Sequence, residues 1–146
     1  MQNGWVSLAL GTGSNASTLG SVLGLDASAW YSVGPLVAGI RTSTASTLFG
    51  EGVDDVAGLL GLRTAGPRAF LHGAVGLASV HSYRTCDGPC SAQRSDPTVG
   101  ALAYSLQALA NYHILGVGAE IFGAAGPGRA SFRGMALSLQ LGWFGR

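Results

Sequence analysis

The side chains that could carry chemistry in this sequence are few and widely spaced. His81 and Ser82 form the adjacent His–Ser pair, and a serine activated by a neighbouring base is a nucleophile for acyl transfer. Adjacent side chains on a strand point to opposite faces, so these two are poorly placed to act together. His72 is expected to face inward, and His113 lies in a predicted turn. We therefore expect no catalytic residues, no metal site and no cofactor.

The two cysteines lie close together in sequence. Cys86 and Cys90 are separated by Asp-Gly-Pro, which could close a tight disulfide loop. Such a bond would suit an oxidising compartment. The alternatives are two free thiols or half of a metal site, and a metal site needs about four ligands. We predict a disulfide.

The composition argues against a soluble surface. Charged residues make up 10% of the 146 residues and hydrophobic ones 47%, whereas soluble domains are about 25% charged. This is too hydrophobic for a disordered chain. The net charge of +1 lacks the basic footprint of a nucleic-acid binder, so no nucleic-acid partner is expected. The length predicts one domain, 1–146.

The last segment alternates with a period of two. Large apolar residues occupy every second position, namely Met135, Leu137, Leu139, Leu141 and Trp143. Between them stand small or polar ones, namely Gly134, Ala136, Ser138, Gln140 and Gly142. This is the pattern of a strand with one apolar face. The small face suits a narrow, filled barrel interior, and the apolar face suits lipid.

Similar alternation predicts seven further strands, at 4–14, 19–31, 35–45, 54–64, 69–83, 98–112 and 115–124. The fold class is all-β, an eight-stranded antiparallel up-and-down transmembrane barrel, with six or ten strands left open. The competing interpretation is an α-helical membrane protein spanning through the uncharged windows 4–25 and 97–119. Glycine and polar residues interrupt both windows, and no flanking basic clusters set an orientation.

The connections should alternate between short turns, at 32–35, 65–68 and 113–114, and longer loops, at 14–18, 46–53, 85–97 and 124–129. A two-residue turn at 33–34 would place Asp26 opposite Arg41. A turn at 113–114 would place Gln107 opposite Glu120. All four side chains then face inward.

The interior should contain a plug of paired polar groups, because unpaired buried charge is costly. The plug residues are Asp26, Arg41, Arg63, His72, Gln107, Glu120 and Gln140. The alternative is a narrow gated or proton-conducting path. Aromatic residues near the strand ends are interpreted as membrane-interface girdles, namely Trp5, Trp30, Tyr31, Tyr83, Tyr112, Trp143 and Phe144.

These features resemble the small eight-stranded bacterial outer-membrane barrels, such as the transmembrane domain of outer-membrane protein A and its smaller relatives. The most specific part is 135–144, which looks like the family's C-terminal strand ending in an aromatic residue. The family usually ends on that aromatic, whereas Gly145 and Arg146 follow Phe144 here. The resemblance implies the outer membrane of a Gram-negative bacterium, a removed signal peptide, surrounding membrane lipids and the barrel assembly machinery as partners.

The leading hypothesis is therefore a non-catalytic outer-membrane barrel with a structural or surface-interaction role. A rigid barrel with contact loops is a common arrangement, and the predicted contact loops are 46–53 and 85–97. Three alternatives remain open. They are an outer-membrane lipid-modifying hydrolase or acyltransferase, a narrow channel, and a soluble lipocalin-like barrel that binds a ligand inside.

Overall fold

The computed structural model describes residues 2–15, 22–47, 52–66, 68–84, 94–95 and 97–143. Eight long strands run through this part of the chain, accompanied by the two-residue strand β6 and one short 3-10 helix, η1. The elements are β1 (Gln2–Asn15), β2 (Val22–Val33), β3 (Leu36–Ser46), β4 (Gly52–Arg63), β5 (Ala69–Arg84), β6 (Arg94–Ser95), β7 (Val99–Tyr112), β8 (Leu115–Ala125), η1 (Gly128–Ala130) and β9 (Phe132–Trp143).

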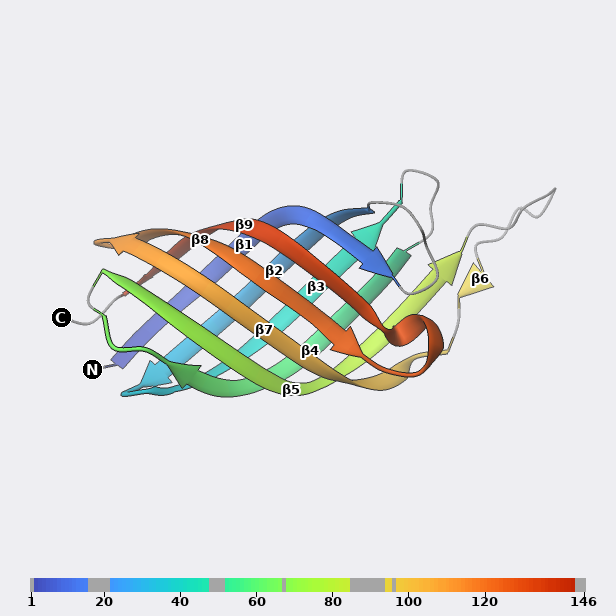
Figure 1. The fold of residues 1–146 in the computed structure, drawn as a ribbon, viewed down its shortest axis with the longest axis horizontal. Helices are drawn as coiled ribbons and strands as arrows, with labels where there is room; N and C mark the ends of the chain where they lie inside the picture. The colour runs from blue at the N-terminus through green and yellow to red at the C-terminus, as the bar shows by residue number, and fades with distance from the viewer. Residues whose placement is uncertain are drawn as a thin grey trace.

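The eight long strands close into an antiparallel barrel (Figure 1). Each strand pairs with its neighbours in the order β4, β3, β2, β1, β9, β8, β7 and β5, and pairing of β5 with β4 completes the ring. Closure gives every long strand a hydrogen-bonded neighbour on both sides, so none is left as an open edge. The predicted eight-stranded up-and-down fold is confirmed.

The barrel has two unlike ends. At the end that we call the turn end, β2 joins β3, β4 joins β5 and β7 joins β8, and β1 begins beside the end of β9. The opposite end, called the loop end here, carries η1 and β6 (Figure 1). Among the described residues, no helix is long and apolar enough to cross a membrane. The described parts of the windows 4–25 and 99–119 form strands and the β7–β8 turn.

The wall of the barrel separates polar from apolar side chains as the alternation predicts. In β9 every second side chain from Phe132 to Gln140 is buried, and the intervening ones are exposed. Leu137 on the outer face is 75% exposed, whereas its neighbour Ser138 is 4% exposed. Larger apolar residues also occur on the inner face, where they fill space between polar groups, namely Val37, Leu59, Val80, Leu109 and Phe122.

One predicted register is wrong. The β2–β3 turn consists of Gly34 and Pro35, so Asp26 lies opposite Ser43, two residues from the expected Arg41. Gly34 has a φ of 60°, and a two-residue hairpin of type II′ requires a positive φ at its first central position. Glycine adopts that φ without steric cost, which fixes the turn here. The shift is even, so every side chain keeps its face.

The register between β7 and β8 is confirmed. Gln107 lies opposite Glu120, and His113 and Ile114 form the turn. His113 has a φ of 54°, the one positive φ at a non-glycine residue in the described chain. Like the Gly34 turn, this turn requires a positive φ, but here a histidine adopts it, and side chains other than glycine rarely do so.

Candidate functional site

Arg41 is the centre of a charged layer inside the barrel, which also contains Asp26, Asp55 and Glu120. Its Nη2 atom donates a hydrogen bond to Asp55 Oδ2 at 2.5 Å, and its Nε lies 3.6 Å from Asp26 Oδ2. Nη1 donates to the carbonyl oxygen of Tyr104 at 2.7 Å, and Nη2 also donates to that of Gly123 at 3.2 Å. The side chain thus crosses the interior from β3 to β7 and β8.

Asp55 is the interior carboxylate that the sequence analysis missed. Its Oδ1 accepts hydrogen bonds from the backbone N–H of Ser43 at 3.1 Å and from the Ser43 hydroxyl. Asp55 lies two residues before Ala57 on β4, and both side chains are buried inside the barrel. The period-two alternation therefore contained the signal, since residues two apart on a strand share a face, but the predicted plug did not include Asp55.

A second set of polar contacts lies on β5, β7, β8 and β9. Glu120 Oε1 accepts a hydrogen bond from the Ser105 hydroxyl at 2.8 Å. His72 Nε2 and Gln107 Oε1 are 2.7 Å apart. On β9, Gln140 Nε2 donates to the Ser138 hydroxyl at 3.0 Å. These contacts join neighbouring strands or turn back on their own strand, and they hold the polar side chains inside the wall.

The charged layer contains more acid than base. Among the described residues, Asp26, Asp55 and Glu120 are buried there with a single guanidinium, that of Arg41. Arg63 is not brought to this layer, because it lies at the turn end of β4. Its guanidinium covers the ring of Phe70 at 4.4 Å. Arg41 is therefore the cation on which the buried carboxylates depend.

An aromatic layer fills the interior near the turn end. It consists of Trp5, Trp30, Phe70 and His72. The Trp5 and Trp30 rings stack with centroids 6.3 Å apart, and the Trp30 and His72 rings meet edge to face with centroids 4.5 Å apart. Trp30 Nε1 donates a hydrogen bond to the Ser28 hydroxyl at 2.8 Å. These contacts are those of a packed core.

The interface assignment of Trp5 and Trp30 is wrong. Both side chains are buried, at 2% and 3% exposure, inside the barrel. Position near a strand end suggested a girdle, but the face of the strand decides where the ring points. Trp5 is adjacent to the outward Val6, so the alternation places it inward. Its indole fills the narrow barrel instead of contacting headgroups.

The remaining described residues of the predicted girdle lie on the outer face. Tyr31, Tyr112 and Trp143 are exposed and stand at the turn-end termini of β2, β7 and β9. Tyr83 lies at the loop end of β5 and is half-buried. Aromatic side chains at such positions are typical of a membrane interface. Phe144 lies outside the described residues.

The candidate catalytic pair lies on opposite sides of the wall. Ser82 is buried inside, whereas His81 is half-buried on the outer side of β5. His113 stands in the β7–β8 turn with its ring against Tyr112. Within the described chain, no group of three or more His, Cys, Asp or Glu residues could hold a metal ion.

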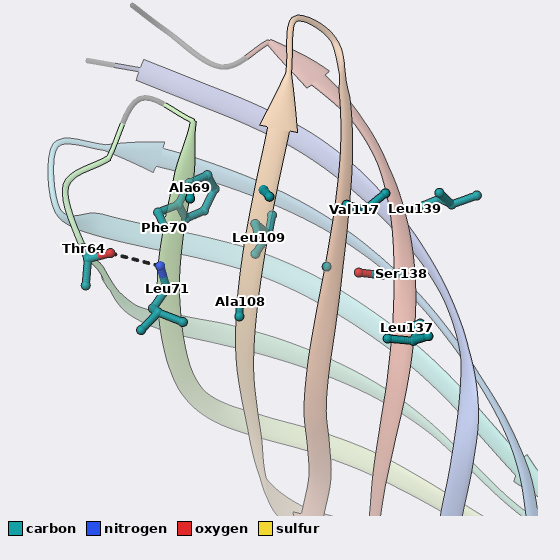
Figure 2. A pocket seen from close by; sticks show the side chains of 12 residues that line it. Thr64, Ala69, Phe70, Leu71, Ala108, Leu109, Val117, Leu137, Ser138 and Leu139 are labelled. Atoms are coloured by element: carbon teal, nitrogen blue, oxygen red, sulfur yellow. Dashed lines mark hydrogen bonds between the residues drawn. The ribbon is translucent and has the colours of Figure 1, made fainter.

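A shallow apolar groove of about 740 Å³ crosses the outer face of β5, β7, β8 and β9 (Figure 2). Small Ala108 and Ala110 form part of its lining, between the larger Leu71 and Leu137. The Thr64 hydroxyl accepts a hydrogen bond from the Leu71 N–H at 2.9 Å (Figure 2). The described lining offers no nucleophile–base set, and its apolar surface suits lipid chains.

Known structures share this architecture. Neisserial surface protein A is 10% identical and aligns over 99% of this chain and 97% of its own, with a TM-score of 0.69. The N-terminal barrel domain of Pseudomonas aeruginosa OprF is 9% identical and aligns over 95% of this chain and 97% of its own, with a TM-score of 0.64. Ail, the attachment invasion locus protein of Yersinia pestis, is 11% identical and aligns over 97% of this chain and 96% of its own, with a TM-score of 0.60. The chain has the fold of these small barrels. No protein-family model and no characterised protein sequence matches it.

Two sequence predictions concern residues outside the described ranges. Cys86 and Cys90, with most of 85–97, are among them, and so are residues 48–51 of the predicted contact loop 46–53. The disulfide and the contact role of these loops remain predictions.

Proposed function

We propose that this protein is an integral β-barrel of the bacterial outer membrane with a structural or surface-contact role and no catalytic activity. The proposal rests on a distribution of side chains that is the reverse of that in soluble proteins, where apolar residues are inside and charged residues outside. Leucine, valine and isoleucine cover the outer face, while arginine, aspartate and glutamate are buried inside. In water this outer face would be a very large exposed apolar patch. In a bilayer it is the expected surface.

The packed interior supports a structural role over a channel. Arg41, Phe122, His72, Gln107, Gln140 and Glu120 are among the largest fully buried side chains. An eight-stranded barrel is just wide enough for its side chains to fill. The soluble lipocalin-like alternative needs the apolar face inside, and the structure has it outside.

Folding into lipid tests the membrane part of the proposal. The refolded chain should enter phosphatidylcholine vesicles, give a strand spectrum by circular dichroism, and migrate differently on gels before and after boiling. In a Gram-negative host, the protein expressed with an export signal should fractionate with the outer membrane. A folded, monodisperse protein in buffer without detergent would contradict the proposal.

Conductance separates a structural barrel from a narrow channel. The wild-type protein in planar bilayers should give no discrete conductance steps. Stable steps in the wild type that disappear in Glu120→Gln would favour the channel.

Surface contact is proposed for the predicted loops 46–53 and 85–97. One structure of Ail holds the heparin analogue sucrose octasulfate, so a small barrel of this fold can bind a polyanionic carbohydrate. Cells displaying the whole chain should bind immobilised heparin or host-surface proteins, and replacing either loop with Gly-Ser repeats should reduce that binding. If both loop replacements bound as well as the wild type, the surface-contact role would be wrong and only the structural role would remain.

Assembly is proposed to use the last strand. The outer face of β9 is apolar at every second residue from Met135 to Trp143, which fits recognition by the barrel assembly machinery. Changing Leu139 and Leu141 together to Asn should reduce the amount assembled in cells more than it reduces refolding into vesicles. Equal losses in the two assays would argue against a recognition signal.

A further inference from the structure

One cation stands out on the outer face of the barrel. Among the outward-facing strand side chains that the structure describes, Arg133 is the one arginine. It is the second residue of β9, close to the loop end, and its side chain is exposed. On the same face, the following outward residues are apolar from Met135 to Trp143. A charged side chain on a lipid-facing surface is costly unless it reaches a polar layer or partner.

The length of β9 places Arg133 at the membrane boundary. Arg133 and Trp143 are ten residues apart, which is about 33 Å along a strand at about 3.3 Å per residue. For a strand tilted by about 40°, this corresponds to about 25 Å along the membrane normal, the height of the apolar band of an outer-membrane barrel. With Trp143 at the turn-end interface, the guanidinium lies at the level of the lipid headgroups on the loop side.

The guanidinium lies beside hydroxyl groups from neighbouring strands. Arg133 pairs with Ser14 of β1 on one side and with Gly123 of β8 on the other. Its Nε donates a hydrogen bond to the Ser14 hydroxyl at 3.4 Å. Tyr104 of β7 pairs with Gly123, and a Cβ added there would lie 2.5 Å from the Tyr104 hydroxyl. The missing side chain at Gly123 therefore lets the Tyr104 hydroxyl lie over β8, towards Arg133.

These residues line a depression of about 340 Å³ in the outer face. Its lining consists of Ser14, Tyr104, Ala124, Ala125, Ser131, Phe132 and Arg133. The Ser131 hydroxyl accepts a hydrogen bond from the Gly126 N–H and donates one to the Gly126 carbonyl, which fixes the rim next to η1. The described lining contains no carboxylate, so nothing in it repels an anion.

We propose that this depression binds the phosphate group of a membrane lipid in the leaflet on the loop side. Arginine presents a planar fork of N–H donors that matches phosphate oxygens in pairs. Of the Arg133 donors, Nε is the one that has a hydrogen-bond partner among the described residues, so the terminal N–H groups of the guanidinium are available to a ligand. The hydroxyls of Tyr104 and Ser14 supply further donors, and the acyl chains continue along the apolar face below. This inference rests on the proposed membrane location.

The test compares lipids that differ in the phosphate alone. The whole chain, refolded in detergent, is incubated with dipalmitoyl phosphatidic acid or with dipalmitoyl glycerol, and bound lipid is counted by native mass spectrometry. We expect one phosphatidic acid to be retained and Arg133→Gln to weaken its binding about tenfold, the scale of one charge-assisted hydrogen bond. Tyr104→Phe should weaken binding less. Arg68→Gln is the matched control, since Arg68 is exposed in the β4–β5 connection at the turn end.

Three results would overturn the site. They are equal retention of dipalmitoyl glycerol, unchanged binding in Arg133→Gln, and competition by millimolar inorganic phosphate, which would indicate a site for the free ion. Insertion of each variant into phosphatidylcholine vesicles is measured in parallel. If the wild type fails to insert, the membrane proposal and this one both fall. If all variants insert and Arg133 has no effect on binding, the lipid-phosphate site alone is wrong.

Discussion

The charged layer and the aromatic layer fill the same barrel by different physics. Around Arg41, hydrogen bonds and ion pairs connect β3 to β4, β7 and β8 across the interior. Around Trp30, ring stacking and edge contacts fill the space near the turn end. The first arrangement depends on every member being present, because a buried charge without a partner is strongly destabilising. The second depends on volume, since a smaller side chain leaves a cavity.

The difference shows why a narrow barrel can contain charge at all. The apolar outer face separates the charges from the surroundings of the barrel. Inside, Arg41 reaches two carboxylates and two backbone carbonyl oxygens. The aromatic layer then fills the turn-end part of the interior with little charge. The following changes test this division, beginning with the largest expected effect.

Arg41→Met should lower the free energy of unfolding by about 3–5 kcal/mol, because it leaves Asp26 and Asp55 without their cation. Urea unfolding in lipid vesicles, followed by tryptophan fluorescence, measures the loss. Adding Asp26→Asn and Asp55→Asn should restore much of the stability. A single mutant as stable as the wild type at pH 8 would remove Arg41 from the centre of the layer.

Trp30→Ala should cost about 3 kcal/mol, the lower part of the range for a large aromatic truncation. Circular dichroism during urea titration is the measurement, and the loss should be equal at pH 4 and pH 8. Trp143→Ala on the outer face is the control, with a smaller loss expected. A strong pH dependence for Trp30→Ala would show that the two layers are coupled.

His72→Leu should cost about 1–3 kcal/mol, because the buried Gln107 amide loses its hydrogen-bond partner. His72 belongs to the aromatic layer and also contacts the polar groups, so it tests the boundary between the layers. The double mutant His72→Leu with Gln107→Leu should be more stable than the sum of the single losses predicts. Strictly additive losses would mean that the two side chains act independently.

The smallest effects concern the two tight turns that close the aromatic end. Gly34→Ala should lower the free energy of unfolding by about 1 kcal/mol, because a positive φ is strained in a residue with a Cβ. His113→Gly should raise the free energy of unfolding by up to about 1 kcal/mol, because glycine adopts the positive φ at this position without strain. Both are measured by urea unfolding in vesicles. A loss in His113→Gly would reveal that the ring contact of His113 with Tyr112 matters more than backbone strain.

The alternation of side chains was sufficient to predict the strand count, the two faces and the inward position of Arg41, His72, Gln107 and Glu120. It was sufficient because side-chain direction in a strand is a local property with a period of two. It also contained the inward positions of Asp55, which the predicted plug left out, and of Trp5, which was assigned to the interface because its place near a strand end was given more weight than its face. Those two errors were errors of interpretation, and the residues themselves carried the information.

What the sequence alone determined is therefore the barrel wall, with its strands, its faces and its turn at His113. What only the tertiary structure decided is the set of partners. The Gly34 turn shifts β2 by two residues against β3 and places Asp26 opposite Ser43. The partners of Arg41 are Asp55 on β4 and the carbonyl oxygens of Tyr104 and Gly123 across the interior. Contacts across a barrel depend on the registers of all the strands together, and no local pattern in one strand records them.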